Sequence, residues 1–291
     1  MKSILLFILT VLLAISCGTS VKRPTPMASD NVSKVPFDSG YALVNGLNMY
    51  YEIYGEGNPL VLIHGGGSTI QSTFGRVIPL LAKNHKLIAV ELQAHGRTGD
   101  RKTALSFTQD ADDIAALLQF LEIPKADIFG FSNGGTTALE MGIRHPGMVG
   151  KIVAASPLAK RNGAPDWFWQ VMSKAKLQNM PAQLRTAYLE VNPDSAGLQN
   201  MHDKDAERMI NFTDIPDEQL EGIQSPVFII IADNDVILEE HGKELVNLIP
   251  DSKLLIVPGM HGSYIGEITS FKPGTKTSDY VIPQIEEFLG D

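Results

Sequence analysis

Apolar side chains in this sequence gather in short runs, and the segments between the runs have a helical pattern. Six runs of four or five residues are largely apolar on both faces, which is typical of strands covered on both sides, as in a parallel sheet. These runs are residues 60–63, 87–90, 126–129, 152–155, 227–231 and 254–257. The candidate helices are residues 107–121, 133–144, 239–248 and 280–289. The alternation of strand and helix predicts a doubly wound α/β fold with a mostly parallel sheet.

Two parts of the chain depart from this alternation. Near the start, residues 41–44 and 47–54 flank Asn45-Gly46, a dipeptide that favours a type I′ turn, so we expect an N-terminal antiparallel hairpin. Residues 159–222 contain no strand pattern, although they are rich in tryptophan and methionine. We expect a helical cap there, inserted over the carboxyl ends of the strands, where such sheets bind ligands.

The first residues of the chain have the character of an export signal. Lys2 precedes an apolar run over residues 4–15, which is too short to span a bilayer as a helix and suits the apolar region of a secretory signal. The run ends in Ala-Ile-Ser-Cys17, and this segment resembles a bacterial lipoprotein signal in which Cys17 becomes the lipidated first residue. Ala14 stands where that pattern most often has leucine. Ordinary cleavage is the alternative, and it would give a soluble secreted or periplasmic protein.

This interpretation divides the chain into three parts. Residues 1–16 are the predicted signal, residues 17–36 are a flexible tether rich in Ser, Thr, Pro and Lys, and residues 37–291 are the folded domain. We expect contact with a membrane only through the lipid anchor, in a bacterial cell envelope.

The composition allows a sizeable core and narrows the partners. The 291 residues are 44% hydrophobic and 20% charged, which is typical of a globular protein. The formal net charge of −9 argues against nucleic acid as a partner, because that binding depends on clustered Lys and Arg. The single cysteine excludes a disulfide within the chain.

A candidate nucleophile follows the predicted strand at 126–129. Gly130-Phe-Ser132-Asn-Gly134 fits G-x-S-x-G between that strand and the next predicted helix. Glycines suit a sharp strand-to-helix turn because side chains at the flanking positions would collide, and the helix N-terminus places unpaired N–H groups beside the serine. A helix N-cap serine is the alternative at this position. The strand–turn–helix context favours the nucleophile.

On these residues the chain resembles the α/β-hydrolases, and in particular their cap-bearing, esterase-like branch. The segment His64-Gly-Gly-Gly67 is similar to the oxyanion loop of that family. An oxyanion hole needs two N–H donors about 3 Å from the forming oxyanion. We expect one from Asn133 and the other from Gly66, or from Gly67 if the loop is shifted. A phosphate loop is a poor alternative because no G-K-[ST] follows, and a plain turn is the remaining one.

The resemblance also implies the acid and the base. A serine needs a base to take its proton, and histidine has a suitable pKa. The family places the base after the last strand, where His261 lies, and the acid after the strand before it. Two carboxylates occur there, and the register of the family's G-x-x-D segment selects Asp235, with Asp233 as the alternative. The implied triad is therefore Ser132, Asp235 and His261.

The same acidic segment suggests a calcium loop, which the sequence does not support. Glu244 falls at position 12 counted from Asp233, but Ile237 and Leu238 occupy positions five and six, where a ligand and a glycine are needed. The sequence predicts no metal and no cofactor.

These residues together predict acyl transfer, in which Ser132 attacks a carbonyl and water then clears the acyl-enzyme with His261 as base. A small-molecule carboxylic ester is the leading substrate class, ahead of lactones, thioesters and vinylogous C–C bonds. Trp167, Trp169 and Met172 are candidate pocket walls, or they only attach the cap to the core. An acyltransferase, a ligand-binding relative and a peptidase of the proline-iminopeptidase kind remain open.

Overall fold

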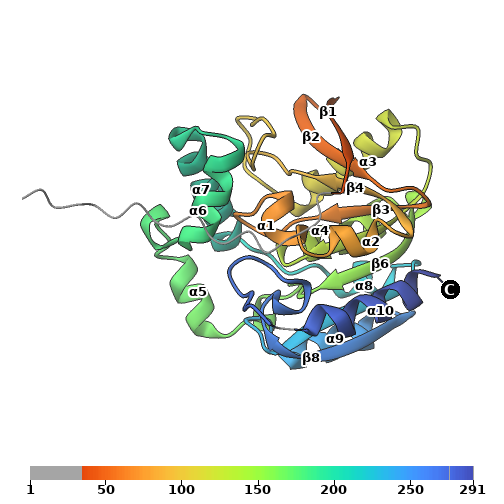
Figure 1. Cartoon of the computed structure of the whole chain (residues 1–291). Coiled ribbons are helices and arrows are strands. Elements are labelled where there is room, and N and C mark those ends of the chain that lie inside the picture. Colours follow the sequence, from red (N-terminus) through yellow and green to blue (C-terminus); the bar gives the residue numbers. More distant parts are fainter. Residues whose placement is uncertain (1–34, 275, 291) are drawn as a thin grey trace, which may run out of the picture. The chain divides into compact units, whose positions relative to one another are not determined.

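A single eight-stranded sheet forms the centre of the protein (Figure 1), in the strand order β1-β2-β4-β3-β5-β6-β7-β8. The structure is a computed structural model, and it describes residues 35–274 and 276–290. The strands are β1 (Phe37–Val44), β2 (Leu47–Tyr54), β3 (Asn58–Ile63), β4 (His85–Val90), β5 (Ala126–Phe131), β6 (Val149–Ala155), β7 (Val227–Asn234) and β8 (Ser252–Met260). The predicted signal and all but two residues of the predicted tether lie outside the described residues.

Strand directions follow the expected pattern. β1 and β2 form an antiparallel hairpin, β2 pairs antiparallel with β4, and all pairs from β4 to β8 are parallel. The hairpin turn is Asn45-Gly46, where both residues have positive φ (47° and 78°), as a type I′ turn requires. The predicted α/β-hydrolase fold, with its mostly parallel sheet and antiparallel start, is confirmed.

Helices cover both faces of the sheet. The α-helices are α1 (Ile70–Phe74), α2 (Ile78–Leu81), α3 (Phe107–Phe120), α4 (Asn133–Arg144), α5 (Asp166–Met172), α6 (Ala182–Val191), α7 (Ser195–Ile210), α8 (Asp217–Glu221), α9 (Glu239–Leu248) and α10 (Thr277–Gly290). One buried apolar cluster joins the sheet to α3, α4, α8 and α9, and another joins the opposite face to α1, α2 and α10. Neighbouring residues of β3 alternate between the two clusters, because successive side chains of a strand point to opposite faces.

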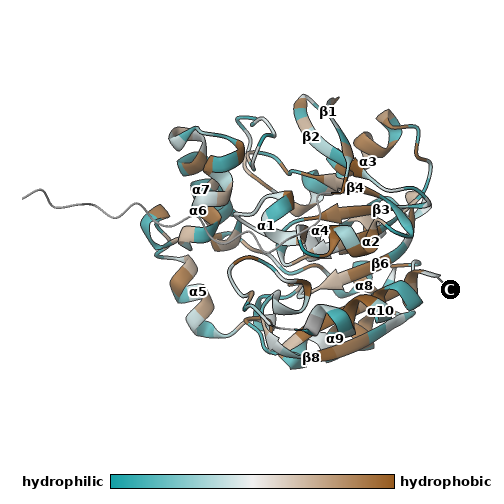
Figure 2. Cartoon of the chain, in the orientation of Figure 1, coloured by the Kyte–Doolittle hydropathy of each residue, from teal (hydrophilic) through white to brown (hydrophobic). Residues whose placement is uncertain are grey.

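Between β6 and β7 the chain leaves the sheet and forms α5 to α8. Figure 1 shows α5, α6 and α7 grouped to one side of the molecule. Hydrophobic residues, brown in Figure 2, are concentrated on the central strands of the sheet. The insertion contacts the loops that follow β3 and β4, since Asn192 donates a hydrogen bond to the Gly96 carbonyl at 2.9 Å and Met180 lies over Gly67. We call residues 159–222 the cap.

Within the described ranges, 35–274 and 276–290, we find no helix that is both long enough and apolar enough to cross a membrane.

Candidate active site

Ser132 lies on a strained turn between β5 and α4. Its backbone has φ 56° and ψ −121°, a conformation that residues other than glycine rarely adopt. The turn is packed so closely that a Cβ atom on Gly130 would collide with the Gly134 carbonyl, and a Cβ on Gly134 would collide with the Ile63 carbonyl. The two glycines of the motif are therefore required by backbone contacts. The result is a serine held at the carboxyl edge of the sheet.

The structure brings Ser132, His261 and Asp235 together, although 129 positions separate the first two. His261 Nε2 lies 3.1 Å from Ser132 Oγ, and His261 Nδ1 lies 2.6 Å from Asp235 Oδ1. Nδ1 keeps its proton and donates a hydrogen bond to the carboxylate, so the unprotonated Nε2 can take the proton of the serine hydroxyl. Asp233 instead accepts the Gly259 N–H at 2.9 Å, at the exposed end of β7. The geometry thus places Asp235 and not Asp233 on the histidine.

The carboxylate of Asp235 is fully buried and held by several donors. Its Oδ2 accepts the Ser156 hydroxyl at 2.6 Å, and its Oδ1 accepts the Ile237 N–H at 3.0 Å. Ser156 in turn lies 2.7 Å from the hydroxyl of the buried Tyr264. Burial alone would raise the pKa of Asp235, but the charge of His261 and these hydrogen bonds outweigh it and lower the pKa. The acid therefore stays ionised at neutral pH.

Sequence reasoning missed Ser156. The residue follows β6, the strand between β5 and β7, so its place in the sheet order was the only available signal. Its backbone φ is +47°, a second strained position beside Ser132.

The surroundings of His261 raise its pKa, which favours its role as a base. Burial would lower the pKa of His261, but the charge and hydrogen bond of Asp235 outweigh it, so the pKa is raised above 6.5. The Phe131 ring, 4.7 Å from the imidazole between centroids, packs against one side of it. The side chain of His261 is still 27% exposed, which leaves it accessible to a substrate or to water.

The predicted oxyanion loop lies against the serine turn. A Cβ on Gly65 would lie 3.3 Å from Ser132 Cβ, and a Cβ on Gly66 would lie 2.5 Å from Asn133 Nδ2. The backbone N–H groups of Gly66 and Asn133 have no hydrogen-bond partner among the described residues. These are the two donors that the sequence assigns first to an oxyanion hole.

Gly67 does not offer such a free donor, which corrects the alternative register of the loop. Its N–H donates to Asp205 Oδ2, on α7 of the cap, at 2.5 Å. Asp205 Oδ2 also lies 2.8 Å from His95 Nε2. No sequence motif marks Asp205, so this contact could not be found from the pattern along the chain.

Two buried histidines support the loop. His64 Nδ1 donates to the Gly65 carbonyl at 2.7 Å, and its Nε2 accepts the Leu92 N–H at 3.1 Å. Burial first, and then the nearby charge of His95, lower the pKa of His64 to about 3, so this ring is neutral. His95 donates from Nδ1 to the Gln93 carbonyl at 2.8 Å. Both rings hold backbone groups in place.

The candidate pocket residues on α5 contact other residues of the cap and the apolar cluster of the α3 and α4 face. Trp167 is 54% exposed and stacks edge-on against Phe168. Trp169 lies under the Arg161 guanidinium and donates to the Arg161 carbonyl at 2.9 Å, while Met172 packs, half-buried, against the apolar cluster of the α3 and α4 face. These contacts attach α5 to the rest of the protein. That the three side chains also line a substrate pocket stays a prediction. Met180 and Leu184, in contrast, lie over Gly67.

The part of the chain that the structure describes has no group of three or more His, Cys, Asp or Glu side chains arranged to hold a metal ion.

Residues 58–200 match the family model of the alpha/beta hydrolase fold. Together with the sheet order and the geometry around Ser132, this match identifies the chain as an α/β-hydrolase-fold protein.

Particular relatives extend the comparison. The chain is 34% identical over 114 residues to a 2-hydroxy-6-oxo-6-(2'-aminophenyl)hexa-2,4-dienoic acid hydrolase of Metapseudomonas resinovorans. The aligned segment covers 37% of this chain and 38% of that protein. It is 33% identical over 151 residues to the serine hydrolase BPHL of Homo sapiens, and the aligned segment covers 49% of this chain and 50% of that protein. The chain therefore matches these relatives over half of their length or less.

Among solved structures, the enol-lactonase from Burkholderia xenovorans LB400 superposes with a TM-score of 0.68 at 19% identity. The superposition covers 87% of this chain and 100% of the lactonase. At this level of identity the likeness shows the fold.

Proposed function

We propose that the protein is a serine hydrolase that cleaves a carboxylic ester or a related acyl bond through an acyl-enzyme on Ser132. The observation that carries this proposal is the chain of contacts from Ser132 Oγ to His261 (3.1 Å) and on to the buried Asp235 (2.6 Å). Two N–H groups beside the serine, which have no partner in the described part of the chain, support the same reaction, because a binding protein has no use for both a proton relay and an oxyanion hole.

In this mechanism His261 Nε2 takes the hydroxyl proton as Ser132 Oγ attacks the substrate carbonyl. The N–H groups of Gly66 and Asn133 stabilise the negative charge that develops on the carbonyl oxygen. His261 then gives its proton to the leaving group, and later activates the water that hydrolyses the acyl-enzyme. Asp235 fixes the imidazole and stabilises its charged form without taking the proton.

The comparisons support hydrolysis and broaden the substrate classes to be tested. The relatives named above include a dienoic acid hydrolase and a serine hydrolase, and the solved structure is an enol-lactonase. A lactone is a cyclic ester, so it belongs with the leading class. The 2-hydroxy-6-oxo-dienoic acids form the second class, in which a carbon group leaves instead of an alcohol.

The experiment is hydrolysis of aryl esters of graded acyl length, with a lactone, a thioester and a 2-hydroxy-6-oxo-dienoic acid in the same panel. We expect Ser132→Ala to lower turnover by about 10⁶-fold, as removal of the nucleophile does in other triads. Ser252→Ala is the matched control, because this serine lies at the opposite end of β8 from His261 and bonds to the Ile249 carbonyl. Turnover that survives in Ser132→Ala would show that Ser132 is not the nucleophile.

We also propose that the protein is exported and anchored by a lipid on Cys17. This proposal rests on the sequence of the first 17 residues alone.

A further inference from the structure

The cap reaches the oxyanion loop through one carboxylate. Asp205 lies on α7, and its side chain is only 12% exposed. Oδ2 accepts the Gly67 N–H at 2.5 Å and lies 2.8 Å from His95 Nε2, while Oδ1 accepts from Arg208 at 2.5 Å. A residue of the cap therefore holds the backbone position next to Gly66, whose N–H is a donor of the proposed oxyanion hole.

A negative charge so close to an oxyanion hole would oppose the reaction if it were uncompensated. The guanidinium of Arg208 and the imidazole of His95 face it. Burial would lower the pKa of His95, but the charge of Asp205 outweighs it and raises the pKa. Arg208 bridges Asp205 to Asp110, which it contacts at 2.7 Å. The contact through which Asp205 can act on the loop is the hydrogen bond that it accepts from the Gly67 N–H.

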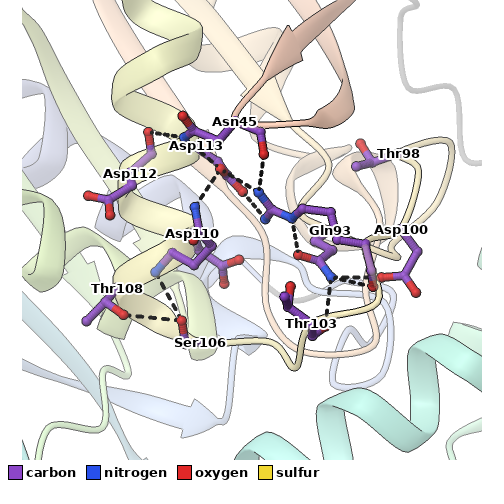
Figure 3. A network of polar contacts seen from close by, with 12 residues as sticks. Asn45, Gln93, Thr98, Asp100, Thr103, Ser106, Thr108, Asp110, Asp112 and Asp113 are labelled. Atoms are coloured by element: carbon purple, nitrogen blue, oxygen red, sulfur yellow. Dashed lines mark hydrogen bonds and ion pairs between the residues drawn. The ribbon is translucent and has the colours of Figure 1, made fainter.

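The helix that carries Asp205 has a fixed position. Lys204, the preceding residue, donates to Asp100 Oδ1 at 2.7 Å and to the Thr103 carbonyl at 2.9 Å. These groups belong to the loop after β4, which we call the anchor loop (residues 93–103). Figure 3 shows the contact of Gln93 with Asp100 within this loop, at 2.8 Å. Arg101, also in the loop, donates to the Asn45 carbonyl at 3.2 Å and to Asp113 Oδ1 at 3.0 Å, which ties the loop to the β1–β2 turn and to α3. The position of α7 is thus set by the main domain.

Gly67 needs an outside partner for its N–H. Its φ of +66° turns the chain in a left-handed conformation, and the N–H points at the cap. A Cβ at this position would lie 2.9 Å from Met180 Cε, so the cap also covers the residue sterically. If α7 moved away, the Gly67 N–H would lose both its carboxylate and its cover, and only its longer contact with His95 Nε2, at 3.3 Å, would remain to hold it.

We propose that Asp205 is a positioning residue that orients the oxyanion loop, so that the oxyanion hole is complete only while the cap is closed. This inference rests on the proposed function. Asp205 acts through Gly67 on the direction of the neighbouring Gly66 N–H, and it need not touch the substrate. A merely structural Asp205 would attach the cap as Lys204 does, with no specific effect on the oxyanion.

The test measures kcat and KM of the full chain on an ester and on its thionoester, in which sulfur replaces the carbonyl oxygen. Sulfur is a weak hydrogen-bond acceptor. The ratio of kcat on the ester to kcat on the thionoester therefore reports hydrogen-bond donation by the oxyanion hole. We expect Asp205→Ala to lower kcat on the ester by about tenfold or more, with KM within about threefold, and to lower the ratio. Asp205→Asn keeps an oxygen that can accept the Gly67 N–H, and should retain the ratio and most of kcat.

Lys204→Ala is the matched control, because it removes the neighbouring contacts of α7 with Asp100 and Thr103 but leaves Asp205 and its hydrogen bond to Gly67 in place, so it should leave the ratio unchanged. If Asp205→Ala does not fold, Asp205→Ser replaces it, since its hydroxyl is one bond shorter and falls short of Gly67. A wild-type ratio in the Ala or Ser variant, an equal drop in Lys204→Ala, or a lost ratio in Asp205→Asn would overturn the inference alone. A wild-type protein that cleaves no ester would instead refute the proposed function.

Discussion

Replacement of Ser156 by alanine tests whether the triad depends on the groups behind its acid. Ser156 Oγ donates to Asp235 Oδ2 at 2.6 Å and lies 2.7 Å from the Tyr264 hydroxyl, and all three groups are buried. In Ser156→Ala, Asp235 Oδ2 keeps only one hydrogen bond, from the Ala232 N–H at 3.3 Å. The Tyr264 hydroxyl keeps only a contact of 3.4 Å with the Ile230 carbonyl. Two buried polar groups are thus left poorly satisfied.

The magnitude follows from the loss of one hydrogen bond to a charged group and the weakening of a neutral one. A hydrogen bond to a charged group contributes about 1.5–3 kcal/mol, and a neutral bond about 1 kcal/mol. We expect the free energy of unfolding to fall by about 2–3 kcal/mol, which corresponds to about 5–10 °C in Tm for a domain of this size. Asp235 keeps its bonds to His261 and to the Ile237 N–H. We therefore expect turnover to fall only about tenfold, or about 1.4 kcal/mol in the activation barrier.

The assay is thermal unfolding together with ester turnover for Ser156→Ala, with Ser225→Ala as control. Ser225 is equally a buried serine, but it donates to the neutral Val149 carbonyl at 3.2 Å, at the amino end of β6. We expect this control to change the free energy of unfolding by about 1 kcal/mol and to leave turnover unchanged. Wild-type Tm and wild-type turnover in Ser156→Ala would refute the reasoning.

Three further predictions follow from the site and the sequence. Asp235→Asn should lower ester turnover by about 10⁴-fold, as in other triads, while Asp233→Asn is tolerated; the reverse pattern in a kinetic comparison would move the acid to Asp233. The rate kcat/KM should rise with pH through an apparent pKa above 6.5, because His261 is a base only when neutral and Asp235 raises its pKa. A pH–rate profile flat between pH 5 and 8 would contradict this role. Cys17→Ser should release the protein from cell membranes on fractionation, and retention of the variant would argue against lipidation.

The sequence by itself determined the parts of the site whose chemistry is local. The G-x-S-x-G motif predicts Ser132 because the collisions that exclude side chains at Gly130 and Gly134 occur within one turn of backbone and its neighbouring strand. Apolar runs likewise predict the parallel strands, since burial on both faces removes the alternation of polar and apolar residues. The hairpin at Asn45-Gly46 follows from the same kind of local requirement, a positive φ at two successive positions.

Only the tertiary structure decided which of several equivalent groups lie at the site. Asp233 and Asp235 are the same residue type two positions apart, but Asp233 at the end of β7 faces the Gly259 N–H, whereas Asp235, just after the strand, faces His261. Asp205 reaches Gly67 across 138 positions. The physical reason is that periodicity along a chain records which face of an element is buried, whereas a hydrogen bond between elements depends on where each one packs. That placement is a property of the whole fold.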